Sequence, residues 1–262
     1  MSRLSLNQWT TRRWSVAEAV SGCVRHEIAS IGLWRDHVAE HGLEATATLV
    51  RDAGLRVSSL CRGGFFTRPG WRDDNHRAID EAAVLDAACL VLVPGGLPPG
   101  SKDLVGARAQ VAEALAELTP YARERGVRLA VEPMHPMYCA DRSVVSSLAQ
   151  ALDLAPPEVG VTVDCFHVWW DPEIVAQIAR AGDRIASFQV CDLLDPLPAD
   201  VLLGRAMMGD GVIDFTPLCA AVAAAGYTGD IEVEIFNADV WAADPDEVLA
   251  TMKRRYAELI AG

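Results

Sequence analysis

Short apolar segments alternate with longer amphipathic segments along the whole chain, and this alternation limits the fold more than any other feature of the sequence. The longer segments, such as 104–126, repeat their apolar residues about every 3.6 positions, which is typical of a helix packed on one face. Strands alternating with helices are typical of parallel β/α units. We expect eight strands, at residues 3–8, 27–34, 56–61, 89–94, 128–133, 160–165, 185–192 and 230–236.

The number of these units and the chain length predict a single (β/α)8 barrel. Eight units in 262 residues match the usual size of that fold. No linker or change of composition divides the chain, so we expect one domain over residues 1–262. The alternative is an open doubly wound sheet, but no GxGxxG turn follows the first strand. Glycine precedes several strands, as helix C-termini prefer, at Gly54, Gly126, Gly182 and Gly226.

Charge and composition exclude several classes of function. The formal net charge is −13, without a basic patch in the sequence, which disfavours nucleic acid as a partner. No segment is long and apolar enough for a signal peptide or a membrane span, so we expect a cytoplasmic protein. The seven cysteines are scattered and form no CxxC pair, which argues against disulfides and structural zinc. The two lysines, Lys102 and Lys253, lie in a loop and a terminal helix, which disfavours Schiff-base chemistry.

Polar side chains stand near the C-terminal ends of four predicted strands, where barrel enzymes carry their active sites. Alternate strand residues face the interior, and this parity directs Glu132, Asp164, Gln189 and Glu234 inward. Three carboxylates in a low-dielectric interior repel one another and raise one another's pKa unless a positive group lies among them.

Two solutions to this charge problem remain open from the residues alone. A divalent cation is one, because carboxylate and amide oxygens are the ligands that hard cations prefer. Separate salt bridges to arginine are the other, with candidates at Arg62, Arg128 and Arg205.

Several residues after strand ends are candidates for substrate binding, each with a structural alternative. Arg62 opens the segment CRGGFFTRPG and either belongs to a tight turn or contacts substrate. His135, in EPMHP, is either a loop hydrogen-bonding residue or a substrate contact. Aromatic residues either cap the barrel or give a sugar an apolar wall, and they are Trp9, Phe65, Phe66, Trp169 and Trp170.

Five motifs together resemble the xylose isomerase-like TIM barrels, a superfamily also called the sugar phosphate isomerase/epimerase group. That group includes ketose 3-epimerases, hydroxypyruvate isomerases, inosose isomerases, dehydratases and endonuclease IV-type nucleases. The resemblance covers essentially the full length, but it fixes no substrate. The motifs are AVEPMH (130–135), TVDCFH (162–167), FQVCD (188–192), GRAMMGDGVIDF (204–215) and GYTGDIEVEIF (226–236).

The resemblance implies a metal-dependent site in the barrel. Glu132, Asp164, Gln189 and Glu234 would hold one divalent metal ion. Many relatives have histidine at the position of Gln189, whereas hydroxypyruvate isomerase-like members have glutamine. Four oxygen ligands favour Mn²⁺ or Mg²⁺, are compatible with Co²⁺, and favour Zn²⁺ less.

The resemblance also implies the roles of individual residues. Glu132 and Glu234 lie on opposite sides of the bound substrate and exchange a proton with its carbon, through a metal-stabilised enediolate. His167 and Arg205 occupy positions that touch substrate oxygens in relatives. We therefore expect an isomerase or epimerase of a small ketose, sugar or polyhydroxy carbonyl compound.

Three other functions remain as alternatives. A dehydratase of the inosose or 3-dehydroshikimate type would use the same machinery. An endonuclease IV-like nuclease is disfavoured, because that chemistry uses three zinc ions bound by several histidines and only His135 and His167 stand near strand ends. A non-catalytic sugar-binding barrel would not need both glutamates. A homo-oligomer is compatible with the sequence, and no basic cluster along the chain demands a phosphorylated substrate.

Overall fold

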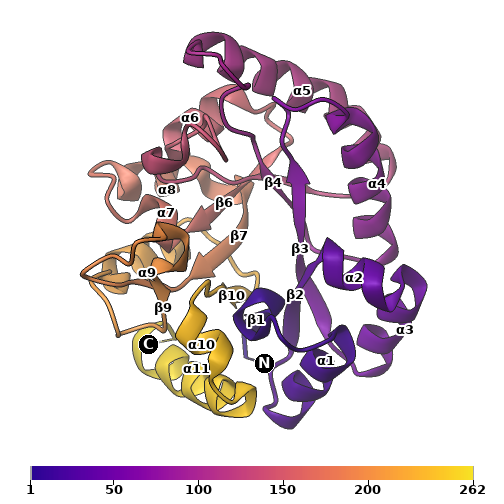
Figure 1. Cartoon of the computed structure of the whole chain (residues 1–262), viewed down its shortest axis with the longest axis vertical. Coiled ribbons are helices and arrows are strands. Elements are labelled where there is room, and N and C mark those ends of the chain that lie inside the picture. Colours follow the sequence, from indigo (N-terminus) through magenta and orange to yellow (C-terminus); the bar gives the residue numbers. More distant parts are fainter. Residues whose placement is uncertain (1, 262) are drawn as a thin grey trace.

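The computed structural model describes residues 2–261 and shows a closed barrel of parallel strands with helices around it (Figure 1). The strands follow one another around the barrel in the order β1-β10-β7-β6-β5-β4-β3-β2. Each predicted strand segment coincides with one barrel strand, so the predicted fold is confirmed. The barrel strands are β1 (Leu4–Asn7), β2 (Ser30–Trp34), β3 (Arg56–Gly64), β4 (Leu90–Val93), β5 (Leu129–Val131), β6 (Gly160–Asp164), β7 (Ile185–Val190) and β10 (Ile231–Val233).

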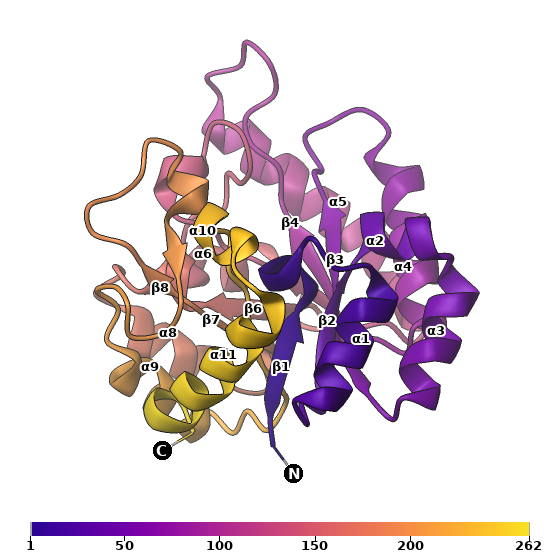
Figure 2. The same ribbon diagram turned by 60° about the horizontal axis from the view of Figure 1, so that its bottom comes forward.

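The loops that follow β3, β5 and β7 project on the same side of the molecule, beyond the C-terminal ends of the strands (Figure 2). None of the helices in residues 2–261 combines the length and the apolar character needed to cross a membrane. The helices are α1 (Val16–Arg25), α2 (Arg35–His41), α3 (Leu43–Asp52), α4 (Trp71–Val84), α5 (Leu104–Glu124), α6 (Leu148–Leu154), α7 (Cys165–Val168), α8 (Ile174–Ala181), α9 (Phe215–Ala224), α10 (Ala238–Ala242) and α11 (Pro245–Leu259).

Side chains of the barrel strands alternate between two packing layers. Leu129 and Val131 of β5 belong to the large core between strands and helices, whereas Ala130 belongs to a separate small cluster. The predicted inward and outward parity of β5 accounts for this division. The small cluster consists of Trp34, Cys61, Cys89, Val91, Ala130 and Ala186. Much of the remaining interior is filled by buried polar side chains, among them Ser5, Ser59, Thr162, Gln189 and Glu232.

A small antiparallel sheet lies beyond the end of β7 and is absent from the sequence prediction. It pairs β8 (Asp192–Leu193) with β9 (Arg205–Ala206). The predicted strand 185–192 is therefore too long, because β7 ends at Val190. The carboxylate of Asp192 holds the returning loop, since it accepts hydrogen bonds of 2.9 to 3.0 Å from the backbone N–H groups of Gly209, Gly211 and Ile213. Arg205 lies in β9, directly before this loop, and its pairing with β8 places it over the barrel.

The predicted glycines at helix ends have left-handed backbone, with φ of 70°, 70°, 51° and 85° at Gly54, Gly126, Gly182 and Gly226. Gly64, at the end of β3, is more constrained. Its φ is 102°, and a Cβ atom there would lie 2.0 Å from the carbonyl oxygen of Val93 on β4. Glycine therefore allows β3 and β4 to approach each other at the C-terminal end of β3, two residues after Arg62.

Gly64→Ala is expected to lower the free energy of unfolding more than Gly126→Ala does. Both variants carry the left-handed backbone cost of about 1–2 kcal/mol. No atom lies within 4 Å of a Cβ at Gly126, whereas overpacking at Gly64 adds roughly 1–3 kcal/mol. Chemical denaturation of the two variants and the parent measures the difference. Equal losses would contradict the proposed crowding at Gly64.

Candidate functional site

The four predicted metal ligands come from four neighbouring strands of the barrel, β10, β7, β6 and β5. Glu132 directly follows β5, Asp164 ends β6, Gln189 lies in β7 and Glu234 directly follows β10. Asp164 and Gln189 are paired in the strand register, and all four side chains are buried. The fold therefore brings these residues together at one end of the barrel, where their interactions depend on the charges between them.

Arg205 is the positive group that lies among the carboxylates. Its Nη1 atom is 2.8 Å from Asp164 Oδ2 and 3.3 Å from Glu234 Oε2. The guanidinium also lies over two aromatic rings, with its central carbon 4.5 Å from the ring centroid of Phe166 and 5.2 Å from that of Phe236. Of the three candidate arginines, Arg205 makes these ion pairs, so one guanidinium is shared between two acids.

One guanidinium does not compensate all of the buried negative charge. Burial raises the pKa of Glu132 well above its ordinary value, and the charges of Glu234 and Asp164 raise it further. Burial raises the pKa of Glu234 to about 8, although Arg205 acts in the opposite direction. The pKa of Asp164 is also raised by burial against the effect of Arg205. Burial and the neighbouring charges thus favour the protonated forms of Glu132 and Glu234, and a further cation would oppose this effect.

His167 is fully buried, and a hydrogen-bond donor faces each of its ring nitrogens. The backbone N–H of His135 donates to Nδ1 over 3.2 Å, and Arg205 Nη2 lies 3.1 Å from Nε2. A neutral imidazole has one acceptor nitrogen, so it accepts from one of these two donors at a time. Burial lowers the pKa of His167 well below its ordinary value, and Arg205 lowers it further, which keeps the ring neutral. Nε2 also lies 3.8 Å from Asp164 Oδ2, so the edge of the ring stands beside the predicted metal ligands.

The donor atoms fit a divalent cation. Gln189 Oε1 is buried and receives no hydrogen bond within residues 2–261, whereas Asp164 Oδ2 contacts the Arg205 guanidinium at 2.8 Å. Ligand atoms of Glu132, Asp164 and His167 lie within 4.8 Å of one another, while Glu234 groups in the same way with Cys61 and Glu232. The three predicted carboxylate ligands thus fall into two groups, and Arg205 contacts one member of each, Asp164 and Glu234.

Glu232 is the main buried residue of this region that the sequence analysis did not assign. Its carboxylate accepts hydrogen bonds from four side chains, and it is 1% exposed. The Gln189 amide nitrogen donates to Glu232 Oε1 over 3.1 Å; because a carboxylate can only accept, Gln189 Oε1 is directed away. The other donors are Asn7 (2.6 Å), Ser58 (2.5 Å) and Ser59 (2.8 Å).

Asn7 connects Glu232 to the candidate site a second time. Its amide nitrogen donates to Glu232 Oε1 and, over 3.0 Å, to Glu234 Oε1. Its amide oxygen accepts from the indole N–H of Trp34 over 2.8 Å. Gly32 leaves room for this arrangement, since a Cβ atom there would lie 2.5 Å from the Glu232 carboxyl group. The alternating DIEVEIF pattern predicts that Glu232 faces inward, but it does not identify these partners.

An aromatic wall stands beside the site. Trp9, a predicted substrate contact, packs on Trp34 with ring centroids 4.4 Å apart and on Phe236 at 5.6 Å. Trp34 and Phe236 were not singled out by the sequence. Trp241, from α10, donates its indole N–H to the backbone oxygen of Trp9 over 2.8 Å. This wall consists of residues from four separate parts of the chain.

The remaining predicted contacts lie in different surroundings. Phe66 is fully buried in the outer core, where its ring packs on Trp71 at 5.5 Å, and its neighbour Phe65 is the more exposed ring. Trp169 packs partly buried against the same core. His135 is partly exposed next to His167, and its side chain also caps its own loop.

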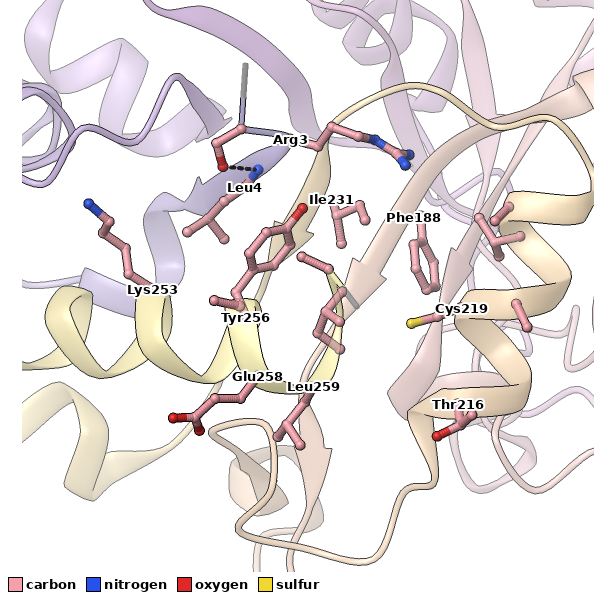
Figure 3. Close-up of a pocket in the computed structure, with 17 residues that line it drawn as sticks. Arg3, Leu4, Phe188, Thr216, Cys219, Ile231, Lys253, Tyr256, Glu258 and Leu259 are labelled. Carbon is pink, nitrogen blue, oxygen red and sulfur yellow. Dashed lines mark hydrogen bonds between the residues drawn. The ribbon is translucent and has the colours of Figure 1, made fainter.

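Two cavities differ in their relation to this site. A cavity of about 380 Å³ is lined by Trp34, Cys61 and Arg62 and opens beside the candidate residues. A larger one, of about 840 Å³, lies between β7, α9 and α11 (Figure 3). Phe188 and Tyr256 line the larger cavity, and Phe188 projects from the opposite face of β7 to Gln189. The larger cavity therefore contacts none of the predicted site residues.

Two curated proteins similar to this chain are named as an isomerase and a dehydratase. Inosose isomerase from Bacillus licheniformis is 25% identical, over 99% of this chain and 98% of that protein. 3-Dehydroshikimate dehydratase from Pseudomonas aeruginosa is 32% identical, over 52% of this chain and 22% of that protein.

Solved structures and a family model agree with this similarity. The protein SMc04130 from Sinorhizobium meliloti is 50% identical, with a TM-score of 0.96 over 99% of this chain and 98% of that one. The IOLI protein with a bound zinc atom has a TM-score of 0.83 at 19% identity, over 100% of this chain and 98% of that one, which shows a common fold. The family model described as xylose isomerase-like TIM barrel matches residues 23–256. The chain therefore belongs to the xylose isomerase-like TIM barrel family.

Proposed function

We propose that this protein is a divalent-metal-dependent isomerase or epimerase of a small ketose or related polyhydroxy carbonyl compound. The observation that carries the proposal is the pair Glu132 and Glu234, two buried carboxyl groups with raised pKa that follow β5 and β10 at one polar site. The similarity to inosose isomerase over almost the full length of both chains supports the same class of reaction.

Glu132, Asp164, Gln189 and Glu234 would hold the metal through oxygen atoms. When bound, a divalent cation supplies Lewis acidity that polarises a carbonyl oxygen and stabilises negative charge next to it. The oxygen donor set favours Mn²⁺ or Mg²⁺ and is compatible with Co²⁺. The zinc in the IOLI protein makes Zn²⁺ the alternative to test.

Proton transfer is the part of the reaction assigned to the two glutamates. A pKa near the working pH lets a carboxyl group take up a proton and return it, and Glu234, at about 8, meets this condition. If one glutamate removes the proton and the other returns a proton to the opposite face of the same carbon, the product is an epimer. Return to the adjacent carbon gives an isomer.

Neighbouring side chains would orient the substrate and keep water away. His167 Nε2, which stands between Asp164 and Arg205, would contact a substrate oxygen. Arg205 can donate to the same oxygen or to its neighbour. The wall of Trp9, Trp34 and Phe236 excludes water from the carbon that loses its proton.

A dehydratase is the second candidate, favoured by the 32% identity with 3-dehydroshikimate dehydratase over half of this chain. It begins with the same proton abstraction. The difference comes afterwards, when a hydroxyl group on the next carbon leaves as water. The product of the reaction, and not the residues of the site, therefore distinguishes an isomerase from a dehydratase.

The isomerase proposal predicts deuterium uptake without loss of water. Ketoses incubated with the Mn²⁺-loaded protein in D₂O should gain deuterium at the carbon next to the carbonyl, as measured by NMR. Glu132→Gln and Glu234→Gln should each slow this uptake by roughly 10²–10⁴-fold. Glu113→Gln, at an exposed position of α5, is the matched control and should match the parent. An unsaturated product would favour the dehydratase, and undiminished uptake in both site variants would exclude the mechanism.

Replacement of Gln189 by histidine should change the metal preference. The parent is expected to bind Mn²⁺ more tightly, relative to Zn²⁺, than Gln189→His does, because the variant adds a nitrogen ligand. Calorimetric titration of chelator-treated protein with each metal measures the two affinities. Gln177→His, on α8, controls for a histidine elsewhere. Unchanged relative affinities in Gln189→His would place residue 189 outside the metal site.

Glu232→Gln tests whether this carboxylate orients the ligands. Glu232 now accepts hydrogen bonds from four side chains, and the NH₂ group of the new amide would face some of these donors. Gln189 and Asn7 are then expected to lose their fixed positions. Mn²⁺ affinity is expected to fall by about 10–100-fold, as when partners of metal ligands are changed in other sites. Calorimetry gives the affinity, thermal unfolding reports whether the variant is folded, and Glu113→Gln is the control. A folded variant with the affinity of the parent would refute this role.

A further inference from the structure

Arg62 is a half-buried cation for which the structure provides no anion. Its side chain leaves the end of β3, and within residues 2–261 the guanidinium makes no salt bridge and no hydrogen bond. Its nearest recorded partners are rings: its central carbon lies 4.5 Å from the ring centroid of Phe65 and 5.8 Å from that of Trp34. Burial lowers the pKa of Arg62 from its ordinary value, which reflects incomplete compensation of its charge.

The other shielded arginines near the barrel mouth are compensated. Arg35 binds both Asp74, at 3.1 Å, and Glu81, at 2.5 Å. Arg205 is shared between two carboxylates of the candidate site, as described above. Arg62 therefore differs from its neighbours in lacking a carboxylate partner, although it is at a similar depth.

More positive charge lies close to Arg62. Burial is the largest influence on the Arg62 pKa and lowers it; Cys61 and Asp36 act in the opposite direction, and the charges of Arg142 and Arg68 lower it further. Arg68 approaches the same Phe65 ring, with its central carbon 4.5 Å from the ring centroid. Arg142 Nε lies 3.4 Å from its neighbour Asp141. The fold thus gathers cations from the loops after β3 and β5 in a protein of strongly negative net charge.

Cys61 lies between the space beside Arg62 and one of the proposed acid/base residues. Arg62 and Arg68 line the cavity of about 380 Å³ together with Trp34 and Cys61, and the acids that also line it are Asp36 and the two partners of Arg35, Asp74 and Glu81. The Cys61 sulfur lies within 4.8 Å of carboxylate oxygens of both Glu232 and Glu234. One residue thus separates the cavity of Arg62 from Glu234.

We propose that the substrate carries an anionic group, a carboxylate or a phosphate, at the end remote from its reacting carbons, and that Arg62 binds this group. A guanidinium matches the planar spacing of oxygens in both groups and can bind them through two parallel hydrogen bonds. Arg68 and Arg142 add attraction at longer range. The inference rests on the proposed function for the position of the reacting carbons. The anionic charge of the substrate is inferred from Arg62 alone.

Three small probes that share a hydroxymethyl ketone test the proposal. Dihydroxyacetone is neutral, hydroxypyruvate has a carboxylate in place of one hydroxymethyl group, and dihydroxyacetone phosphate carries a phosphate. Calorimetric titration of the Mn²⁺-loaded protein gives the dissociation constant of each probe. At least one charged probe should bind about tenfold or more tightly than dihydroxyacetone, and the tighter of the two identifies the anionic group.

Arg62→Met should remove this preference, because methionine keeps contact with the rings and has no charge. Arg62→Lys should retain part of it, since lysine keeps the charge without the paired donors. Added NaCl should weaken only the charged probes. Arg254→Met, at an exposed position of α11, should keep the preference of the parent. Equal affinities for all three probes, or a preference that survives in a folded Arg62→Met, would overturn the proposal.

Failure of this proposal can be distinguished from failure of the proposed function. Deuterium uptake by dihydroxyacetone, with equal binding of the three probes, would retain the isomerase chemistry and exclude the anion site. Arg62-dependent binding of a charged probe, without deuterium uptake from any of the three, would retain the anion site and argue against proton exchange on these compounds.

Discussion

The burial of four carboxyl groups inside one barrel is the constraint on which the rest of the structure depends. Glu132, Asp164, Glu232 and Glu234 are each at most 5% exposed. Ionised carboxylates at such depth need either hydrogen-bond donors or opposite charge. The barrel uses both solutions at different places: neutral donors surround Glu232, whereas the other three acids share a region with a single guanidinium. The charge left uncompensated in that region would attract a cation and favours protonated carboxyl groups.

Arg205 is the positive charge that these acids share, and a divalent metal at the proposed site would be an alternative one. The guanidinium reaches Asp164 and Glu234 because the β8–β9 sheet returns the chain over the barrel, and Asp192 fixes that return through three backbone N–H groups. A metal ion held by the predicted ligands would take over part of this compensation. Arg205 would then be free to donate toward substrate oxygens, so one residue can stabilise the protein without metal and orient the substrate with it.

Much of the fold follows from local patterns, and part of the site follows from strand parity. Eight strands and the inward direction of residues such as Gln189 are predictable because side chains alternate along each strand. The partners of Glu232 are not predictable in this way, because Ser58 and Ser59 come from β3 and their depth relative to β10 depends on the stagger of the barrel. The gathering of Arg62 and Arg142 is also invisible in the sequence, where 79 residues separate them and no basic run occurs. Long-range register, which local composition does not encode, decides both features.

Anomalous diffraction from crystals grown with Mn²⁺ tests the metal site most directly, because it locates the ion without assuming a substrate. We expect one manganese peak whose nearest protein atoms are oxygens of Glu132, Asp164, Gln189 and Glu234. Absence of a peak at saturating Mn²⁺, with Arg205 Nη1 still between Asp164 and Glu234, would show that the guanidinium alone serves these acids and would contradict a metal-dependent site.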